Sequence, residues 1–382
     1  MFTVAIIDIG STSVGGALVA ERSRRAGINE VCSTITASSR NEIAFQEQID
    51  LDHFLNGMEA VLKQTLTDLQ KQGRESPRQI EIFLSAPFYA AQTVVSRRSE
   101  AQPFTVTPKL VSELVRSEAA KFERDEHQFI EHKVMQFRLN GYPLIRPYGR
   151  QTTDLEVTSY VGIASSTVLN RFREVVHNVF HRKELVWHSF TFAFFSLLNR
   201  VLPADRCFLI VDIGGEITEL SVLGKGVLRG SASFPSGRNS LVRSLAQKLH
   251  TTSSEAYDRL KLLVNEAQHT QAKSDLLEAL TEIKIAWSQS FEDSLGQILS
   301  DCLFFDRAYV IGDPTVMSLF RSWIAERSIE TVVAGRQPIE TETVTKELLN
   351  HFCQLASSVA PDPSLMVETI FYDTITGLAK RP

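Results

Sequence analysis

Two distant segments of the chain share one pattern of hydrophobic and polar positions. Residues 4–14 and 208–222 each contain an apolar run rich in β-branched residues, then Asp-Ile-Gly, then small or polar residues, then a second apolar run. A continuous apolar run is typical of a strand buried on both faces, and a glycine directly behind it permits a tight turn. The pattern predicts two similar β-hairpins, and their wide separation indicates a duplicated domain.

The stretch between the hairpins has the pattern of a small α+β unit. Apolar residues at helical spacing predict a helix over 109–123. Residues 134–139 and 155–163 have strand patterns on either side of a turn at Asn140-Gly141. These elements predict an inserted subdomain over residues 86–163.

A charged cluster lies inside this insert, at residues 123–127 and at Glu131 and His132. Charges on both sides of a short apolar pair most often belong to a solvated surface, so we expect a solvated helix end here. Helical patterns also occur at residues 167–180, 189–202, 239–249, 254–263, 276–298, 316–325 and 365–379.

The order of these patterns predicts three structural parts. A first lobe is expected to comprise residues 1–85, 164–203 and 362–382, because the last helix would return to it. The insert of residues 86–163 interrupts that lobe. A second lobe is expected over residues 204–361. The chain of 382 residues is long enough for two lobes and an insert with sizeable cores.

Charge and cysteine content exclude several classes of protein. The 40 basic and 45 acidic side chains give a net charge of −5, which argues against nucleic acid as a partner and against an electrostatic membrane anchor. The four cysteines are scattered, as expected for reduced thiols in the cytoplasm. The most apolar run, at 190–198, is about half the ~20 residues of a membrane-spanning helix. We therefore expect a cytoplasmic protein that does not insert itself into a membrane.

The paired hairpins have the chemistry of a site for a phosphate and a cation. Successive backbone N–H groups in a turn can bind an anion, and an aspartate at a strand end can hold Mg²⁺, usually through water. One such turn is a weak signal, but two with matched flanks would hold a polyphosphate from both sides. Asp8 and Asp212 are the expected metal ligands.

These residues resemble the actin-like ATPase superfamily, and within it the families of the bacterial division protein FtsA and the pilus-assembly protein PilM. The hairpins 4–14 and 208–222 resemble the family's two phosphate hairpins, and the stretch 254–261 resembles its segment beside the adenosine. The resemblance implies an α/β, actin-like (ribonuclease H-like) two-lobed fold with an α+β insert of strand-helix-strand-strand type. It also implies ATP and Mg²⁺ as ligands. The residues expected to contact the nucleotide are Asp8, Gly10, Ser11, Thr12, Ser13, Asp212, Gly214, Gly215, Thr218, Gly237, Glu255, Lys261 and Gly312.

Several positions depart from the family pattern. Glu216 replaces a glycine of the second hairpin, which adds a side chain and a negative charge next to the phosphate. Pro314 follows the expected adenosine turn and has no N–H to donate. The segment 188–192 carries no carboxylate that would position an attacking water. Phosphoryl transfer requires a positioned nucleophile and charge stabilisation together, so we expect a weak ATPase at most.

The resemblance implies a scaffold that couples a membrane complex, of cell division or of type IV pilus assembly, to the cytoplasm. Its expected partner is the cytoplasmic segment of a membrane protein or a tubulin-like division protein, with the insert as docking module, and self-association into filaments is a further expectation. Because no amphipathic tail is visible, recruitment to the inner face of the membrane would depend on the partner. Two alternatives remain open. The chain could be a pseudo-ATPase that has lost nucleotide binding, or a small-molecule kinase on the same fold, although no base or substrate motif for a kinase is visible.

Overall fold

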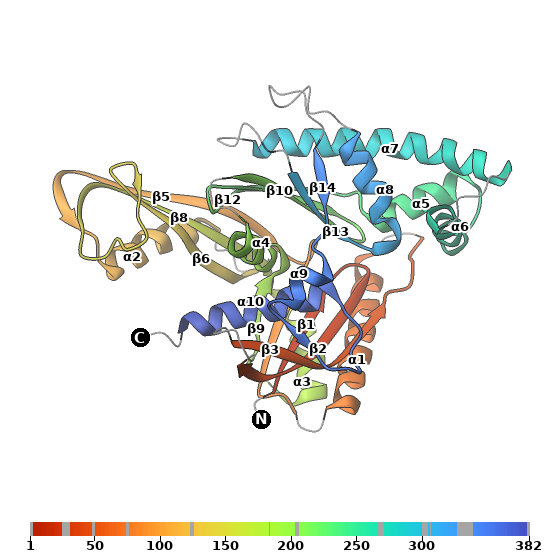
Figure 1. The fold of residues 1–382 in the computed structure, drawn as a ribbon, viewed down its shortest axis with the longest axis horizontal. Coiled ribbons are helices and arrows are strands. Elements are labelled where there is room, and N and C mark those ends of the chain that lie inside the picture. The colour runs from red at the N-terminus through yellow and green to blue at the C-terminus, as the bar shows by residue number, and fades with distance from the viewer. Residues whose placement is uncertain are drawn as a thin grey trace.

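The structure is a computed structural model. It describes residues 3–24, 31–47, 50–73, 76–122, 126–182, 184–202, 206–265, 271–299, 305, 307–326 and 339–379. Two large sheets and a smaller third sheet organise the chain. The third sheet projects to the left of the body in Figure 1.

The first large sheet is built around the first predicted hairpin. Its strand order is β15-β3-β2-β1-β4-β9, in which β1 to β3 are antiparallel and β4 and β9 run parallel to β1. The strands are β1 (Thr3–Ile9), β2 (Ser13–Arg24), β3 (Val31–Glu42), β4 (Gln79–Leu84), β9 (Val186–Ser189) and β15 (Gln354–Leu355). The edge strand β15 pairs with β3, so the chain already contacts the first sheet before residue 362, where we expected it to return.

The second large sheet repeats this arrangement. Its order is β12-β11-β10-β13-β14, again with three antiparallel strands followed by two parallel ones. The strands are β10 (Cys207–Ile213), β11 (Thr218–Gly224), β12 (Val227–Phe234), β13 (Arg307–Gly312) and β14 (Glu340–Glu342). Both hairpins therefore form the centres of equivalent sheets, as the duplicated sequence pattern predicted.

The insert is a four-stranded sheet with one helix. The order is β5-β8-β6-β7, from β5 (Ala90–Thr105), α2 (Pro108–Ala119), the short 3-10 turn η1 (Ala120–Phe122), β6 (His127–Leu139), β7 (Tyr142–Pro143) and β8 (Gln151–Ser165). The strand-helix-strand-strand type is confirmed.

The prediction of a solvated helix end in the insert is wrong. Residues 127–132 belong to strand β6, and Glu131 is buried because its carboxylate accepts hydrogen bonds from the backbone N and the Oγ of Ser189. Residues 123–125 of the same charged cluster lie outside the described residues.

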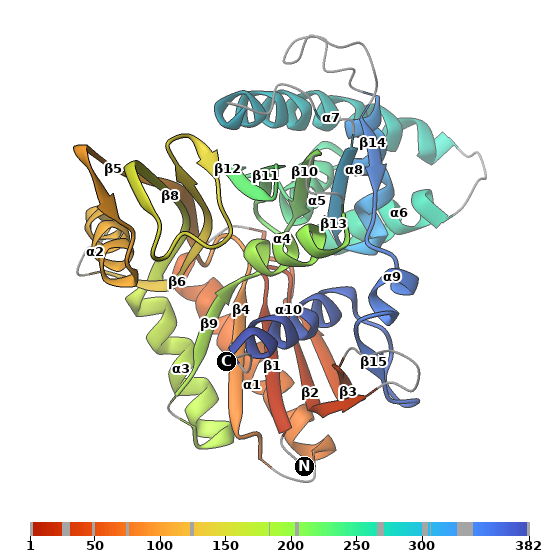
Figure 2. The ribbon, with the colours of Figure 1, turned by 60° about the vertical axis from the view of Figure 1, so that its left-hand side comes forward.

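Helices cover both large sheets and also separate them (Figure 2). The outer face of the first sheet packs on α1 (Leu51–Gln72) and α3 (Ser166–Phe180). The outer face of the second packs on α5 (Arg238–Lys248), α6 (Ser253–Asn265), α7 (Gln271–Ile298) and α8 (Pro314–Ala325). Between the sheets lie α4 (Phe190–Val201) and α10 (Pro363–Ala379), preceded by the short α9 (Lys346–Asn350).

The phenylalanines of α4 belong to the core that joins both sheets. This core also contains Val4 and Ile6 of the first sheet and Phe208 and Ile210 of the second. Among the helices that the structure describes, none has the length and apolar character needed to cross a membrane.

Candidate functional site

The turns of the two hairpins touch each other between the lobes. The Oγ of Ser11 accepts hydrogen bonds from the backbone N of Gly215 (2.8 Å) and of Glu216 (3.2 Å). A Cβ at Gly215 would lie 2.5 Å from the methyl group of Thr12, so only glycine allows this approach. The Ser11 side chain of the first hairpin therefore satisfies two backbone amides of the second hairpin, and these are the amides that would otherwise bind an anion.

A cleft with a volume of about 370 Å³ opens beside this contact. It is lined by both hairpins, by the end of β13 and by the start of α10. Its lining includes two arginines, Arg40 and Arg238, and five carboxyl-bearing residues, namely Asp8, Glu42, Asp212, Asp313 and Asp362. The excess of carboxyl groups disfavours an anionic ligand unless a cation accompanies it.

Arg40 on β3 neutralises part of this negative charge. Its Nη2 lies 2.7 Å from the Oδ2 of Asp8, its Nε lies 2.6 Å from the Oδ2 of Asp362, and its Nη1 donates to the Oγ of Ser13 at 2.9 Å. Burial lowers the pKa of Arg40, but the carboxylates of Asp8 and Asp362 outweigh it and raise the pKa above its usual value. Burial raises the pKa of Asp8 even though Arg40 opposes the shift. A protein cation therefore holds the carboxylate expected to bind Mg²⁺.

Further carboxyl groups are buried around the cleft floor. Burial, with smaller contributions from Glu219 and Asp8, raises the pKa of Asp212 to about 8. Burial raises the pKa of Glu219 to about 7, although the hydroxyl of Tyr89, 2.7 Å from its Oε2, opposes the shift. Burial also raises the pKa of Glu368 on α10 well above its usual value. Crowded acids of this kind are more stable with some of them protonated.

The start of α5 fills the space beside the second hairpin. The backbone N of Arg238 and of Asn239 donate to the carbonyl oxygens of Gly214 and Gly215. A Cβ at Gly237 would lie 2.4 Å from the Gly214 oxygen, so this glycine permits close packing of two backbone segments. The helix N-terminus is thereby occupied by protein carbonyls, which are the groups an anion would have to replace.

The guanidinium of Arg238 lies in a cage of aromatic and acidic side chains. It is 2% exposed, stacks 5.1 Å from the ring of Phe45 and 5.3 Å from the ring of Tyr257, and pairs with Asp313 at 2.5 Å. The hydroxyl of Tyr257 also donates to Asp313, at 3.0 Å. This cluster lies between α5, α6 and the start of α8, and its Tyr257 belongs to the segment 254–261 predicted to lie beside the adenosine.

The departures noted in the sequence have structural roles. Glu216 pairs with Arg243 and accepts from the Nδ2 of Asn239, so α5 neutralises its added charge. Pro314 begins α8, a favourable helix position for proline. Asp313 caps the same helix by accepting from the backbone N of Thr315.

Segment 45–47 of the first lobe crosses to the second lobe and is called the strap below. Phe45 packs on the Tyr257 ring, with ring centroids 5.1 Å apart. Glu47 accepts from the backbone N and the Oγ of Ser253 at the start of α6, at 3.1 and 2.7 Å. These hydrogen bonds lower the pKa of Glu47. The strap caps a helix of the opposite lobe.

The structure brings some of the predicted site residues together and keeps others apart. The cleft is lined by Asp8, Gly10, Ser11, Thr12, Ser13, Asp212, Gly214 and Gly312. Thr218 is buried and its hydroxyl donates to the Ser236 carbonyl. Two further predicted residues lie on α6 and form ion pairs within that helix, Glu255 with Arg259 and Lys261 with Asp258. Those three residues, with Gly215 and Gly237, are not in the cleft lining.

As they stand, these residues fit ATP and Mg²⁺ poorly. The amides of Gly10 and Gly214 donate to the carbonyls of Ser13 and Ile217, and Ser11 occupies the next two amides of the second turn. A nucleotide would have to displace these bonds and the Asp8–Arg40 pair.

The sequence reasoning missed Arg40, Phe45, Arg238 and Tyr257. Arg40, Phe45 and Arg238 lie outside the motifs used to define the site, whereas Tyr257 lies inside the segment 254–261 but was not among the predicted contacts.

Comparisons with known proteins agree with this architecture. No protein-family model matches the sequence, and no curated protein matches it. Among solved structures, a chain of the PilM-PilN type IV pilus biogenesis complex matches with a TM-score of 0.60 and 17% identity, over 98% of this chain and 97% of that chain. MreB 5 of Spiroplasma citri bound to AMPPNP matches with a TM-score of 0.46 and 12% identity, over 100% and 98%. The two-lobed actin-like fold and the likeness to PilM are confirmed.

Proposed function

We propose that this protein is an actin-fold scaffold of the PilM type that binds a cytoplasmic segment of a membrane protein and does so without nucleotide. The claim that no nucleotide is needed rests on the contact between the hairpins, where the Oγ of Ser11 accepts hydrogen bonds from the amides of Gly215 and Glu216. The claim that the protein is a scaffold that binds a membrane-protein segment is supported by the structural likeness to a chain of a PilM-PilN complex over nearly the whole length of both chains. The scaffold is proposed to act in the cytoplasm at the inner face of the membrane.

The insert offers a groove for such a segment. The groove lies between α2 and β6 and has a volume of about 580 Å³. Val111 and Val115 form its apolar floor, while Phe129 and Val134 are partly exposed along β6. An apolar groove beside a helix suits an amphipathic or extended segment with two or three apolar anchors.

Binding of a labelled peptide tests the proposal. The peptide is the cytoplasmic segment of a membrane protein encoded beside this gene, and fluorescence anisotropy reports its affinity. Phe129→Asp should weaken binding by at least tenfold, because it places a charge in the groove. Val95→Asp is the matched control, since Val95 is an exposed apolar residue of the same sheet outside the groove. If both variants lose the same peptide affinity, or if neither loses any, the proposal that the peptide binds in the groove is contradicted.

ATP–Mg²⁺ binding is the second candidate, favoured by the cleft that both hairpins line. The same titration with and without about 5 mM ATP–Mg²⁺ decides between the two. A nucleotide present at 100 times its Kd would stabilise the fold by about 2.7 kcal/mol, which a thermal melt detects readily. We expect no shift in melting temperature and no change in peptide affinity. A clear shift establishes nucleotide binding and contradicts the nucleotide-independent part of the proposal, whether or not the peptide binds.

A further inference from the structure

The far end of the insert carries an ordered loop with exposed apolar side chains. Residues 141–150 connect β6 and β8 at the end opposite to Ser165, where the insert joins α3. In this loop Tyr142 is 78% exposed, Ile145 94% and Tyr148 51%. Exposed apolar side chains gathered at one place usually mark a binding surface.

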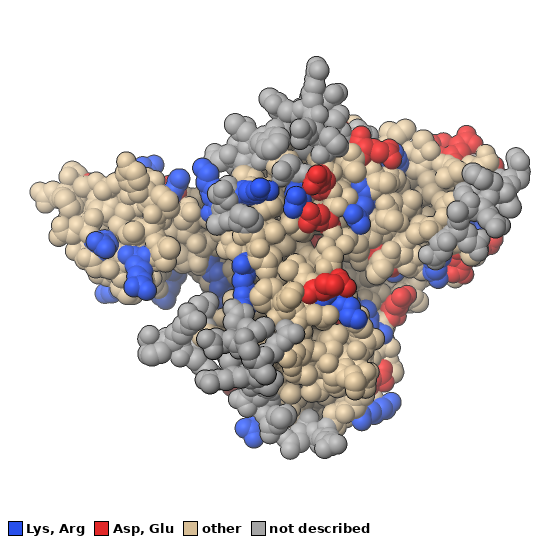
Figure 3. Space-filling view, in the orientation of Figure 1, with Lys and Arg blue, Asp and Glu red and all other residues tan. Residues whose placement is uncertain are grey.

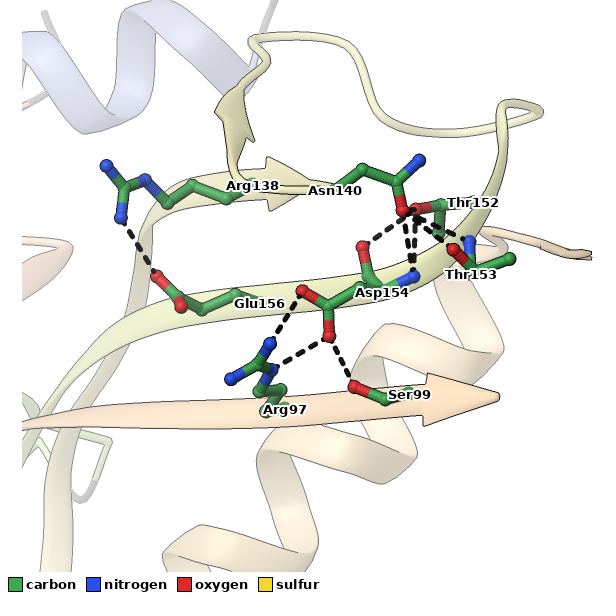
Figure 4. Close-up of polar contacts among 8 residues, drawn as sticks. All are labelled: Arg97, Ser99, Arg138, Asn140, Thr152, Thr153, Asp154 and Glu156. Carbon is green, nitrogen blue, oxygen red and sulfur yellow. Dashed lines mark hydrogen bonds and ion pairs between the residues drawn. The ribbon is translucent and has the colours of Figure 1, made fainter. Parts of the chain in front are cut away.

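Hydrogen bonds hold the base of this loop in one conformation. Asn140 adopts a left-handed conformation (φ 48°) and its Oδ1 accepts from Thr152, Thr153 and the backbone N of Asp154 (Figure 4). The backbone N of Leu144 donates to the Phe137 carbonyl, at 2.9 Å. The exposed side chains are therefore presented by a preorganised loop, which lowers the entropic cost of binding.

The loop is positively charged and lacks acidic residues. Arg146 and Arg150 are exposed and form no ion pair with any residue that the structure describes. The acidic side chains at the loop base are already neutralised, Asp154 by Arg97 and Glu156 by Arg138 (Figure 4). Over the whole insert, the face shown in Figure 3 carries blue side chains and almost no red ones.

We propose that loop 141–150 is a membrane-docking surface that binds bilayers containing anionic phospholipids. Tyrosine rings and arginine side chains both favour the boundary between headgroups and acyl chains, where an apolar part is buried and a polar tip stays hydrated. Ile145 would enter the apolar layer, and Arg146 and Arg150 would contact the phosphates. Juxtamembrane cations are attracted to anionic lipid in this way even on a protein with net negative charge.

The geometry favours a bilayer over a protein segment as the occupant. A peptide would be expected in the groove between α2 and β6, which Tyr148 lines but Tyr142, Ile145, Arg146 and Arg150 do not. A loop that projects from the end of a subdomain can instead be accommodated by a soft interface of headgroups. The two surfaces share only Tyr148, and the tested residues Ile145 and Arg146 lie outside the groove, so either proposal can fail alone.

Cosedimentation of the full chain with vesicles tests the proposal. We expect binding to vesicles of 30% phosphatidylglycerol in phosphatidylcholine, and at least fivefold weaker binding to pure phosphatidylcholine or in high salt. Ile145→Ser and Arg146→Gln should each weaken binding several-fold and together at least tenfold. Both side chains are exposed, so the fold should tolerate these changes.

Matched controls are Ile285→Ser, which removes an exposed isoleucine of α7, and Lys63→Gln, which removes an exposed cation of α1. Both should bind vesicles like the unmodified chain. No cosedimentation at low salt, equal binding to neutral vesicles, or full binding by the double variant would each overturn the proposal. A dimer in light scattering that the double variant loses would instead assign the loop to self-association and likewise overturn it.

Discussion

Arg40 is the residue on which the closed cleft depends most directly. Its single guanidinium faces Asp8 and Ser13 of the first hairpin and Asp362 from a segment far away in the sequence. A planar group with several donors can satisfy such partners together, whereas a lysine would reach one at a time. Arg40 lies where a bound cation would otherwise compensate the buried carboxylates.

Removing this guanidinium should destabilise the fold. Arg40→Ala would leave two carboxyl groups without a cation, and such losses cost about 3 kcal/mol for pairs with little solvent access. Chemical denaturation measures the free energy of unfolding. The free energy of unfolding of Arg40→Lys should lie between the values of the alanine variant and of the unmodified chain.

The control for this prediction is Arg97→Ala, which breaks an exposed ion pair with Asp154. Pairs in water contribute little, so this variant should change the free energy of unfolding much less. If both alanine variants lose the same free energy of unfolding, the ion pairs of Arg40 in the cleft contribute no more than the exposed Arg97–Asp154 pair.

At the scale of elements, the junction between the insert and the first lobe is held by a buried polar cluster. His188 on β9 has its Nε2 2.6 Å from Glu81 of β4 and its Nδ1 3.4 Å from Glu131 of β6. Phe83 and Phe371 pack around its ring. Burial alone would lower the pKa of His188, but the hydrogen bonds to Glu131 and Glu81 raise it.

This shift makes the junction sensitive to pH. Since the folded pKa of His188 lies above the unfolded value of about 6.5, its stabilising contribution is complete below that pH and is lost as the pH rises through the folded pKa. The difference in unfolding free energy between the unmodified chain and His188→Gln should therefore be largest below about pH 6.5 and should shrink as the pH rises above it. His351→Gln, at an exposed histidine, is the control and should show no such trend. A constant difference for His188→Gln would contradict the charge-dependent role.

The sequence allowed most of these elements to be predicted, for physical reasons. Both hairpins are apolar on both faces, so their pattern is unambiguous, and the helices α7, α8 and α10 follow their apolar spacing closely. The start of β6 was missed because Glu131 has a polar side chain that is buried by partners from β9. Local pattern cannot identify such partners, since hydrogen bonds between distant segments override the local preference for solvent.

At the scale of the whole molecule, the two lobes are held together by contacts that no local pattern reveals. The duplication could be read from two matching segments, but the closure depends on Ser11, on the strap and on Arg238. Each of these residues contacts a segment remote in the chain. The sequence therefore predicted that the two hairpins would face each other, but it contained no direct sign that protein groups would occupy much of the cleft they line.

Removing the contacts that the strap makes with the second lobe should allow the two lobes to separate. In the double variant Phe45→Ser, Glu47→Ala, the second lobe loses an aromatic contact with Tyr257 and the cap on α6. Backbone amides that are protected only by closure should then exchange faster with solvent. The amides of Gly215 and Glu216 are the most informative, because both donate to Ser11 of the opposite lobe.

Hydrogen exchange measured by mass spectrometry reports on the peptide that contains those two amides. The variant Leu51→Ser serves as control, since Leu51 is 67% exposed close to the strap and contributes no contact to the second lobe's core. If the double variant exchanges at residues 214–217 as slowly as the control, the hairpin contact closes the lobes without help from the strap. If exchange accelerates there while α1 and α3 remain protected, the lobes open as rigid bodies, and the strap is the element that determines access to the cleft.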